Sequence, residues 1–109
     1  MKNPIITLCG STKFKDEILA WNKTLTLGGA IVLMPGVFAH SGDYITERQK
    51  EELDRLHKRK IAMSDAIVVV DPNGYIGSST REEIGFAKAL GLEIFYTSEL
   101  SNEYWTNYD

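Results

Sequence analysis

Short apolar runs alternate with helical patterns along this chain, and the alternation restricts its fold more than any other feature. Apolar runs of strand length occupy residues 5–9, 30–34, 66–70 and 93–96. Segments with apolar residues at helical spacing lie between them, at 12–27, 46–63 and 79–90. The order β-α-β-α-β-α-β predicts parallel strands, right-handed crossovers and helices on both faces. We therefore predict an α/β fold, a flavodoxin-like or Rossmann-like doubly wound sheet of four or five strands.

Residues at the ends of these segments support the boundaries. Gly28-Gly29 ends the first helix and Gly91 the last, because glycine readily adopts the left-handed conformation past a helix end. Thr46 and Gln49 match a capping box at the start of the second helix. Residues 37–45 predict a loop with an exposed aromatic and a histidine, among Phe38, His40, Asp43 and Tyr44.

Each of the first two helices has a predicted apolar face. In the first helix this face comprises Phe14, Ile18, Trp21 and Leu25. In the second it comprises Leu53, Leu56 and Ile61. We expect these side chains to pack on the sheet.

Length and composition indicate one soluble domain spanning residues 1–109. No apolar run approaches the roughly 20 residues that cross a bilayer, and the N-terminus lacks the apolar core of a signal peptide. A single cysteine, Cys9, fits a reducing compartment, so a cytoplasmic location is expected. The net charge of −3 argues against a nucleic-acid polymer as partner, because that role favours a basic face. The short basic cluster 57–60 is interpreted as a solvated helix end.

Two glycine- and serine-containing loops meet at one edge of the predicted sheet. Gly10-Ser11-Thr12 follows the first strand, and Gly77-Ser78-Ser79 precedes the last helix. Strands one and three are neighbours at the switch point of this fold, so the two loops face each other there. Glycine admits a ligand to the backbone, and a helix N-terminus offers unpaired N–H groups to an anion. Ser11 or Thr12 as a simple N-cap is the structural alternative.

Two adjacent glutamates in the first turn of the last helix are open to more than one interpretation. Ser79 with Glu82 and Thr80 with Glu83 both fit a capping box, and only one pair can form it. If Ser79 and Glu82 form the cap, Glu83 is free to face the strand edge. Spacing alone leaves open whether Glu83 is catalytic.

Other chemically active residues have both a structural and a functional interpretation. Asp71 follows the third strand and either orients a hydroxyl-bearing ligand or forms a turn with the Pro-Asn-Gly after it. His40 and His57 lack the spacing of metal ligands, so no metal or cofactor is expected. Cys9 lies within a strand and is expected to be a buried, inert thiol.

The combination of these motifs resembles the nucleoside 2-deoxyribosyltransferase superfamily, which includes the 2′-deoxynucleoside 5′-monophosphate N-hydrolases. The resemblance spans roughly residues 5–97 and rests on Cys9-Gly10-Ser11, on Asp65-Ala66, and above all on Glu83-Ile-Gly-Phe-Ala after a serine-rich loop. It implies that Glu83, not Glu82, attacks the anomeric carbon of a deoxyribosyl group and forms a covalent glycosyl-enzyme. The acceptor of the glycosyl group then decides the reaction: a second base gives transfer, and water gives hydrolysis.

The chain departs from the family pattern at two positions. Where the family commonly has an aspartate on the helix before the third strand, this chain has His57, which would position the nucleophile or protonate a leaving base with a pKa near neutrality. Six residues before the nucleophile, Gly77 replaces an aspartate or serine that addresses the base or the phosphate. Ser78 and Ser79 remain beside it as donors.

The function predicted from the sequence is cleavage of the N-glycosidic bond of a nucleoside or nucleoside 5′-monophosphate, by hydrolysis or by transfer to another base. The nucleophile is Glu83, assisted by His57, and Asp71 or Tyr75 contacts the sugar. The phosphate or ribose is surrounded by the two loops, Gly10, Ser11, Thr12, Gly77, Ser78 and Ser79. The alternative is a non-catalytic nucleotide-binding or sensing module with the same fold.

The C-terminal tail is the predicted place for contact between subunits. It contains Tyr104, Trp105 and Tyr108, a density of aromatic side chains that favours docking on the body or on a partner. The family resemblance implies a homodimer or higher homo-oligomer, with the loop 37–45 as a second contact region.

Overall fold

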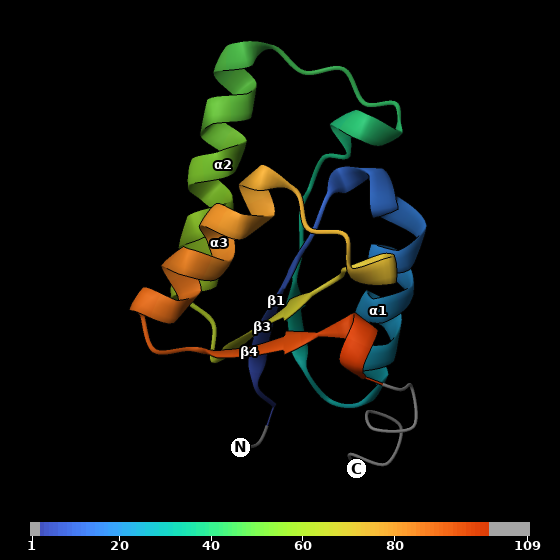
Figure 1. The fold of residues 1–109 in the computed structure, drawn as a ribbon, viewed down its shortest axis with the longest axis vertical. Helices are drawn as coiled ribbons and strands as arrows, with labels where there is room; N and C mark the ends of the chain where they lie inside the picture. The colour runs from blue at the N-terminus through green and yellow to red at the C-terminus, as the bar shows by residue number, and fades with distance from the viewer. Residues whose placement is uncertain (1–2, 101–109) are drawn as a thin grey trace.

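Four parallel strands form a single sheet in the computed structural model, which describes residues 3–100 (Figure 1). They are β1 (Ile5–Cys9), β2 (Ile31–Leu33), β3 (Ala66–Val69) and β4 (Glu93–Tyr96), in the order β2-β1-β3-β4. The central register pairs Ile6 with Ala66 and Cys9 with Val69. The predicted flavodoxin-like α/β fold is confirmed, with β1 and β3 adjacent at the switch point. The aromatic residues of the tail lie outside the described residues.

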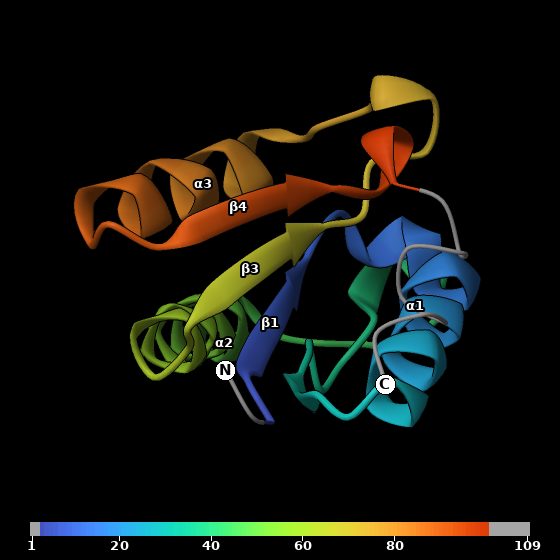
Figure 2. The same ribbon diagram turned by 90° about the horizontal axis from the view of Figure 1, so that it is seen from below.

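Three α-helices cover the two faces of the sheet. They are α1 (Lys15–Leu27), α2 (Glu47–Ala62) and α3 (Ser78–Ala89). Figure 2 shows α1 on the opposite side of the sheet from α2 and α3. Over residues 3–100, no helix combines the length and apolarity that a membrane span requires.

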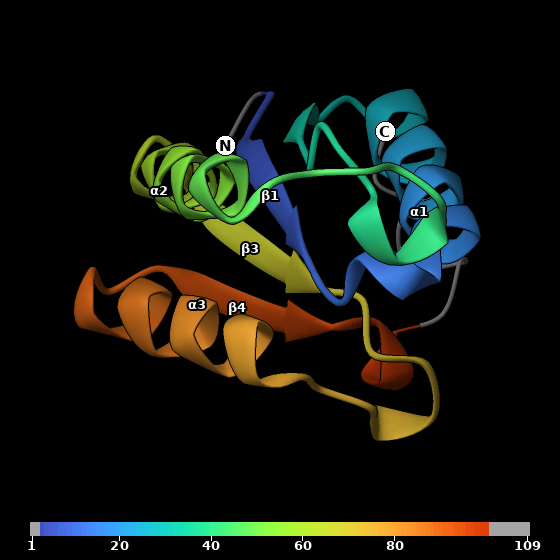
Figure 3. The same cartoon turned by 90° about the horizontal axis from the view of Figure 1, so that it is seen from above.

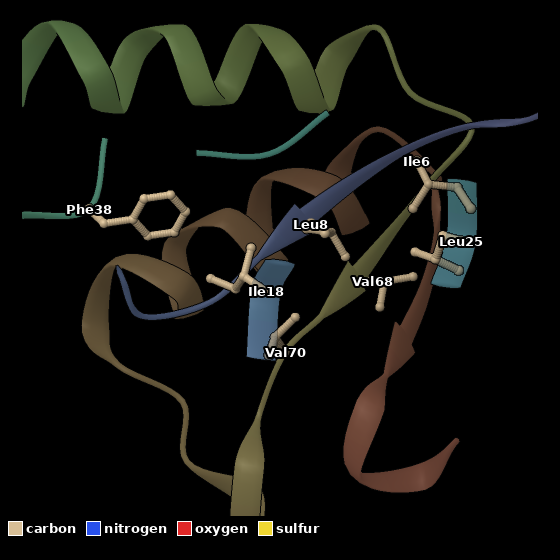
Figure 4. Close-up of a cluster of buried hydrophobic side chains, with 7 residues drawn as sticks. All are labelled: Ile6, Leu8, Ile18, Leu25, Phe38, Val68 and Val70. Carbon is tan, nitrogen blue, oxygen red and sulfur yellow. The ribbon is translucent and has the colours of Figure 1, made fainter. Parts of the chain in front are cut away.

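Alternation along the strands divides the core into two clusters. In β1, Ile6 and Leu8 point to the face covered by α1, where they pack with Ile18 and Leu25 (Figure 4). Cys9 points to the opposite face. There the second cluster joins Cys9 to Ile61, Ile67, Val69, Ile84 and Ala87, under α2 and α3. The alternation thus places the lone cysteine beneath the two helices that follow the switch point.

Helix ends follow the local signals with two exceptions. The capping box of α2 is present, because the Thr46 side chain accepts from Gln49 N while the Gln49 side chain accepts from Thr46 N. The first predicted helix begins as a 3₁₀ turn at Thr12–Phe14 before α1 proper. The predicted Ser79–Glu82 capping box does not form: Gly77 is the N-cap of α3, which has no side-chain cap, and Ser78 and Ser79 are already inside the helix.

The loop 37–45 has the predicted exposed aromatic, which is Tyr44. Phe38 is buried in the cluster under α1, because the loop folds its ring onto Ile18 and its neighbours (Figure 4). The predicted apolar face of α2 was wrong in part. On α2 the buried positions are His57 and Ile61, whereas Leu56 is 43% exposed. The N-terminal part of α2 extends past the sheet, so it has no strand beneath it (Figure 1).

Candidate active site

A cavity of about 510 Å³ opens at the carboxyl ends of the strands, between α2, the start of α3 and the segment that connects β2 to α2. Figure 3 shows this segment passing from the α1 side of the sheet to the start of α2. The cavity has the size of a small-molecule site. Its walls contain nine of the ten site residues predicted from the sequence: Gly10, Ser11, Thr12, His57, Tyr75, Gly77, Ser78, Ser79 and Glu83.

Glu83 and His57 meet at the floor of the cavity, on the side where Cys9 is buried. His57 Nε2 lies 3.6 Å from Glu83 Oε1, and their side chains are 9% and 15% exposed. On α3, Glu83 follows buried Thr80 by one helical turn and precedes buried Ile84, so its side chain turns toward the sheet edge. Glu82, one residue earlier, is exposed. The structure thus distinguishes the two glutamates by position.

Burial alters the protonation of Glu83. The pKa of its carboxyl is raised from 4.5 to about 7, chiefly by desolvation, and a hydrogen bond from the Cys9 thiol to the carboxylate opposes the shift. Among nearby charges, Asp54 and Glu82 contribute to the rise and Lys58 opposes it. Glu83 is therefore a carboxyl group whose ionisation falls near neutral pH, as is common for catalytic groups.

His57 differs from the expectation of a pKa near neutrality. The pKa of its imidazole is lowered from 6.5 to about 4, chiefly by burial, with Lys60 contributing to the shift and Asp54 opposing it. At neutral pH the ring is uncharged. An uncharged imidazole can orient the neighbouring carboxyl by hydrogen bonding but holds no extra proton to give to a leaving group.

The loop after β1 passes very close to the end of β3. A Cβ atom at residue 10 would lie 2.8 Å from the carbonyl oxygen of Val70, so only glycine fits there without displacing backbone. The Ser11 side chain accepts a hydrogen bond from Lys13 N and caps the 3₁₀ turn, as the structural alternative predicted. Gly10 and Ser11 nevertheless both line the cavity.

The N-terminus of α3 presents uncapped backbone groups to the cavity. Gly77, its N-cap, supplies no side-chain acceptor, and the first turn of α3 carries no acidic residue. The first N–H groups of a helix lack intrahelical partners and favour an anion. Ser78 and Ser79 add two exposed hydroxyls at the same edge.

Thr12 fastens the loop 37–45 over the cavity. Its hydroxyl lies 2.8 Å from His40 Nδ1, and its carbonyl accepts a hydrogen bond of 2.9 Å from the Ser41 hydroxyl. His40 and neighbouring residues of this loop thereby become part of the cavity wall. The contact explains why a residue of the first loop and a histidine far along the chain share one site.

Tyr75 is 47% exposed at the cavity mouth and is held by two side chains of the 3₁₀ turn after β1. Its ring packs edge-to-face on Phe14 with centroids 5.6 Å apart, and Lys13 Nζ lies 3.6 Å from its centroid. The phenol is thus oriented while remaining accessible to a ligand.

Asp71 is the one predicted binding residue that does not line the cavity. Its carboxylate, 3% exposed, accepts hydrogen bonds from the Thr97 hydroxyl, from Ser98 N and from the Ser98 hydroxyl. These contacts join the end of β3 to the end of β4. The structure therefore gives Asp71 a role in the sheet edge and no direct access to the cavity.

Several wall residues were not identified from the sequence as site residues. On α2, Leu53 and Leu56 give the wall an apolar part, and Lys60 donates to the carbonyl of Met34 at 2.8 Å. Lys50 and Asp54 of the same helix also line the wall and form an ion pair, with Lys50 Nζ 3.1 Å from Asp54 Oδ2. The available signal was the presence of two leucines on a mostly charged helix, but the periodicity assigned both to the core.

Comparison with known proteins supports the fold. No protein-family model and no curated protein match the sequence. Among solved structures, the fold matches the CMP N-glycosidase BcmB of Clostridium botulinum, with a TM-score of 0.58 and 21% sequence identity. The match covers 84% of this chain and 69% of that chain. The match confirms the fold predicted from the sequence, which this chain shares with a solved N-glycosidase structure.

Proposed function

We propose that this chain cleaves the N-glycosidic bond of a nucleoside or nucleoside 5′-monophosphate, with Glu83 as the nucleophile. The observation that carries the proposal is the position of Glu83, a mostly buried carboxyl group on the floor of a cavity of about 510 Å³, 3.6 Å from the His57 ring. The shared fold with a CMP N-glycosidase supports the same class of chemistry.

In this mechanism the Glu83 carboxylate attacks the anomeric carbon as the bond to the base breaks, which gives a glycosyl ester. The base leaves with the bonding electron pair and takes a proton from solvent. Water then attacks the same carbon, which returns the carboxylate, adds a hydroxyl to the sugar and releases one proton to solvent. Attack requires the ionised form of Glu83, whose pKa of about 7 leaves that form well populated at neutral pH. His57, uncharged there, orients the carboxylate and is a positioning residue.

Substrate binding uses the groups around the nucleophile. The uncapped N-terminus of α3 with Ser78 and Ser79, and the backbone of Gly10 across from it, suit the phosphate or the sugar hydroxyls. Leu53 and Leu56 offer an apolar surface to the flat base. A site prepared for phosphate favours hydrolysis of a monophosphate over transfer between free bases.

Release of free base from a panel of nucleosides and their 5′-monophosphates, ribo and deoxy, tests the proposal. CMP and dCMP are the first substrates to use, and each reaction is run with and without a second base as acceptor. We expect Glu83→Gln to lose turnover by at least about a thousandfold, since the nucleophile is removed. Glu82→Gln, one residue away and exposed, is the matched control and keeps parental turnover.

Two results would contradict the assignment. Parental turnover in the Glu83→Gln variant would exclude Glu83 as nucleophile. Tight binding of a nucleotide by the parent protein, with no base released from any member of the panel, would identify a binding module in place of an enzyme.

A further inference from the structure

The floor of the cavity brings together three different kinds of metal-ligating side chain. Cys9 comes from the end of β1, His57 from α2 and Glu83 from α3. The Cys9 sulfur, one ring nitrogen of His57 and one carboxylate oxygen of Glu83 all lie within 4.8 Å of one another. Between residues 3 and 100, no other group of three such side chains converges in this way.

The spacing is close to that of a tetrahedral metal site. Zinc bonds of about 2.0–2.3 Å place neighbouring ligand atoms about 3.3–3.6 Å apart. His57 Nε2 and Glu83 Oε1, at 3.6 Å, already meet this requirement. The separations that involve the Cys9 sulfur are at most 4.8 Å, so side-chain movements of about 1 Å bring all three atoms within bonding distance of one cation.

The chemistry of the donors selects the class of cation. A thiolate with an imidazole favours Zn²⁺, Co²⁺ or Cd²⁺ over Mg²⁺ and Ca²⁺, which prefer sites made of oxygen. Binding releases to solvent the proton of the Cys9 thiol and the proton of any Glu83 carboxyl that still carries one, and the resulting thiolate and carboxylate together balance the two charges of the cation. The complex is neutral, as suits a position where Cys9 is 0% and His57 is 8% exposed.

The cavity provides both an entry path and a fourth ligand position. His57 and Glu83 belong to its wall, whereas Cys9 lies behind them. A cation entering from the cavity reaches the nitrogen and oxygen donors first and the sulfur last. Its remaining position then faces the cavity, where water completes the coordination.

We propose that Cys9, His57 and Glu83 form a binding site for a thiophilic divalent cation, with Zn²⁺ as the best fit. A bound cation occupies the carboxylate that the proposed glycosidase mechanism uses, so the same site makes the cation an inhibitor. The inhibitory part rests on the proposed function. The binding part is independent of it.

Titration of the chelator-treated full chain with Co²⁺ tests binding without any substrate. We expect one Co²⁺ per chain, with a thiolate-to-cobalt charge-transfer band in the near ultraviolet and the strong visible bands of a four-coordinate ion. Zn²⁺ displaces the Co²⁺ and abolishes both signals, whereas Mg²⁺ leaves them unchanged. Base release, measured with and without EDTA, reports inhibition separately.

Single variants assign the ligands. Cys9→Ser removes the near-ultraviolet band, and His57→Gln and Glu83→Gln each weaken Co²⁺ binding at least about tenfold. Glu82→Gln and His40→Asn keep the parental spectrum, and circular dichroism verifies that each variant is folded. The proposal is overturned if the parent shows no charge-transfer band, if the band persists in Cys9→Ser, or if His57→Gln and Glu83→Gln both bind like the parent. A failure of this kind leaves the chelator-treated glycosidase assay, and thus the proposed function, unaffected.

Discussion

His57 Nε2 lies 3.6 Å from Glu83 Oε1, and this contact joins α2 to α3 above the carboxyl ends of the strands. Burial shifts the two groups in opposite directions, raising the pKa of Glu83 to about 7 and lowering the pKa of His57 to about 4. Both shifts favour the uncharged form. The pair therefore weakens the fold in a pH-dependent way, as is usual for functional sites.

Replacing Glu83 by Gln is expected to stabilise the protein at alkaline pH. Between about pH 4.5 and 7 the unfolded chain releases the Glu83 proton while the folded chain retains it, so stability falls as pH rises. The penalty is complete above pH 7 and amounts to about 3 kcal/mol. Urea denaturation with EDTA present should show Glu83→Gln equal to the parent near pH 4 and more stable by up to that amount at pH 8. An unchanged or lower stability at pH 8 would refute the shift, and Glu82→Gln is the control.

His57 is expected to change the pH dependence of stability in the opposite direction to Glu83. Between about pH 4 and 6.5 the unfolded chain binds a proton that the folded chain does not, so this group makes stability rise with pH. In the parent the two slopes offset each other. His57→Gln, measured by the same denaturation with EDTA present, should remove the rising contribution and leave stability falling from pH 4.5 to 7. A His57→Gln curve parallel to that of the parent would contradict the prediction.

Turnover is expected to increase with pH through about 7, because attack requires the ionised Glu83. The rising part of the profile of turnover against pH is called the limb below. Substitution of two charged neighbours on α2 should move this limb in opposite directions. Asp54→Asn removes a charge that raises the Glu83 pKa and moves the limb to lower pH, whereas Lys58→Gln removes one that lowers it and moves the limb to higher pH.

The pH profile of kcat/KM for base release, with EDTA and at low ionic strength, measures both shifts. Added salt should reduce the difference between the variants, since it screens exposed charges. Shifts of the same sign in both variants would exclude this electrostatic explanation.

Two glycines are expected to respond to alanine with opposite signs. At Gly10 the new Cβ would lie 2.8 Å from the Val70 carbonyl, so Gly10→Ala should cost about 1–3 kcal/mol of stability. Gly85, inside α3, has no atom within 4 Å of the corresponding position, so Gly85→Ala should gain about 1 kcal/mol. Thermal unfolding of both variants makes the comparison, and a stabilising Gly10→Ala would show that the loop readily moves.

Asp71→Ala is expected to reduce stability and leave substrate affinity intact. It removes the acceptor of the Thr97 hydroxyl and of both Ser98 donors, at a cost of roughly 3 kcal/mol. Ser98→Ala removes one of these bonds and should cost less. Chemical denaturation measures the losses, and KM of the folded variant measures affinity. A large rise in KM at unchanged stability would contradict this prediction and indicate that Asp71 contributes to substrate binding.

Local patterns predicted the fold, because the strands and helices depend on short-range periodicity and on caps. The boundaries of β1 and β4 and the Thr46–Gln49 capping box are cases where nearby residues suffice. The two cavity loops were also predictable, since parallel strands bring their carboxyl ends to one edge. Their residues Gly10, Ser11, Thr12, Gly77, Ser78 and Ser79 all line the cavity.

What the sequence did not reveal depends on contacts between distant segments. The burial of Phe38 requires the loop to fold back on α1, and the Asp71 carboxylate finds its donors only after β4. Cys9, His57 and Glu83 lie close together because of which face of β1 Cys9 occupies and which faces of α2 and α3 the other two occupy. The spacing of residues within any one of these elements does not show this. The same holds for the lowered pKa of His57, which arises from burial of its ring. The helical periodicity had predicted buried leucines on this helix and not a buried histidine.

The three residues on the cavity floor each come from a different element, and this has a consequence for the order of folding. α3 packs on residues of both β1 and β3, so its packing surface is complete only when these two strands, far apart in the chain, are paired. Cys9 and His57 therefore acquire their partner only when the last helix docks. A segment that contains only β1, α1 and β2 includes Cys9 but neither His57 nor Glu83. The floor of the cavity is therefore complete only in the fully folded chain.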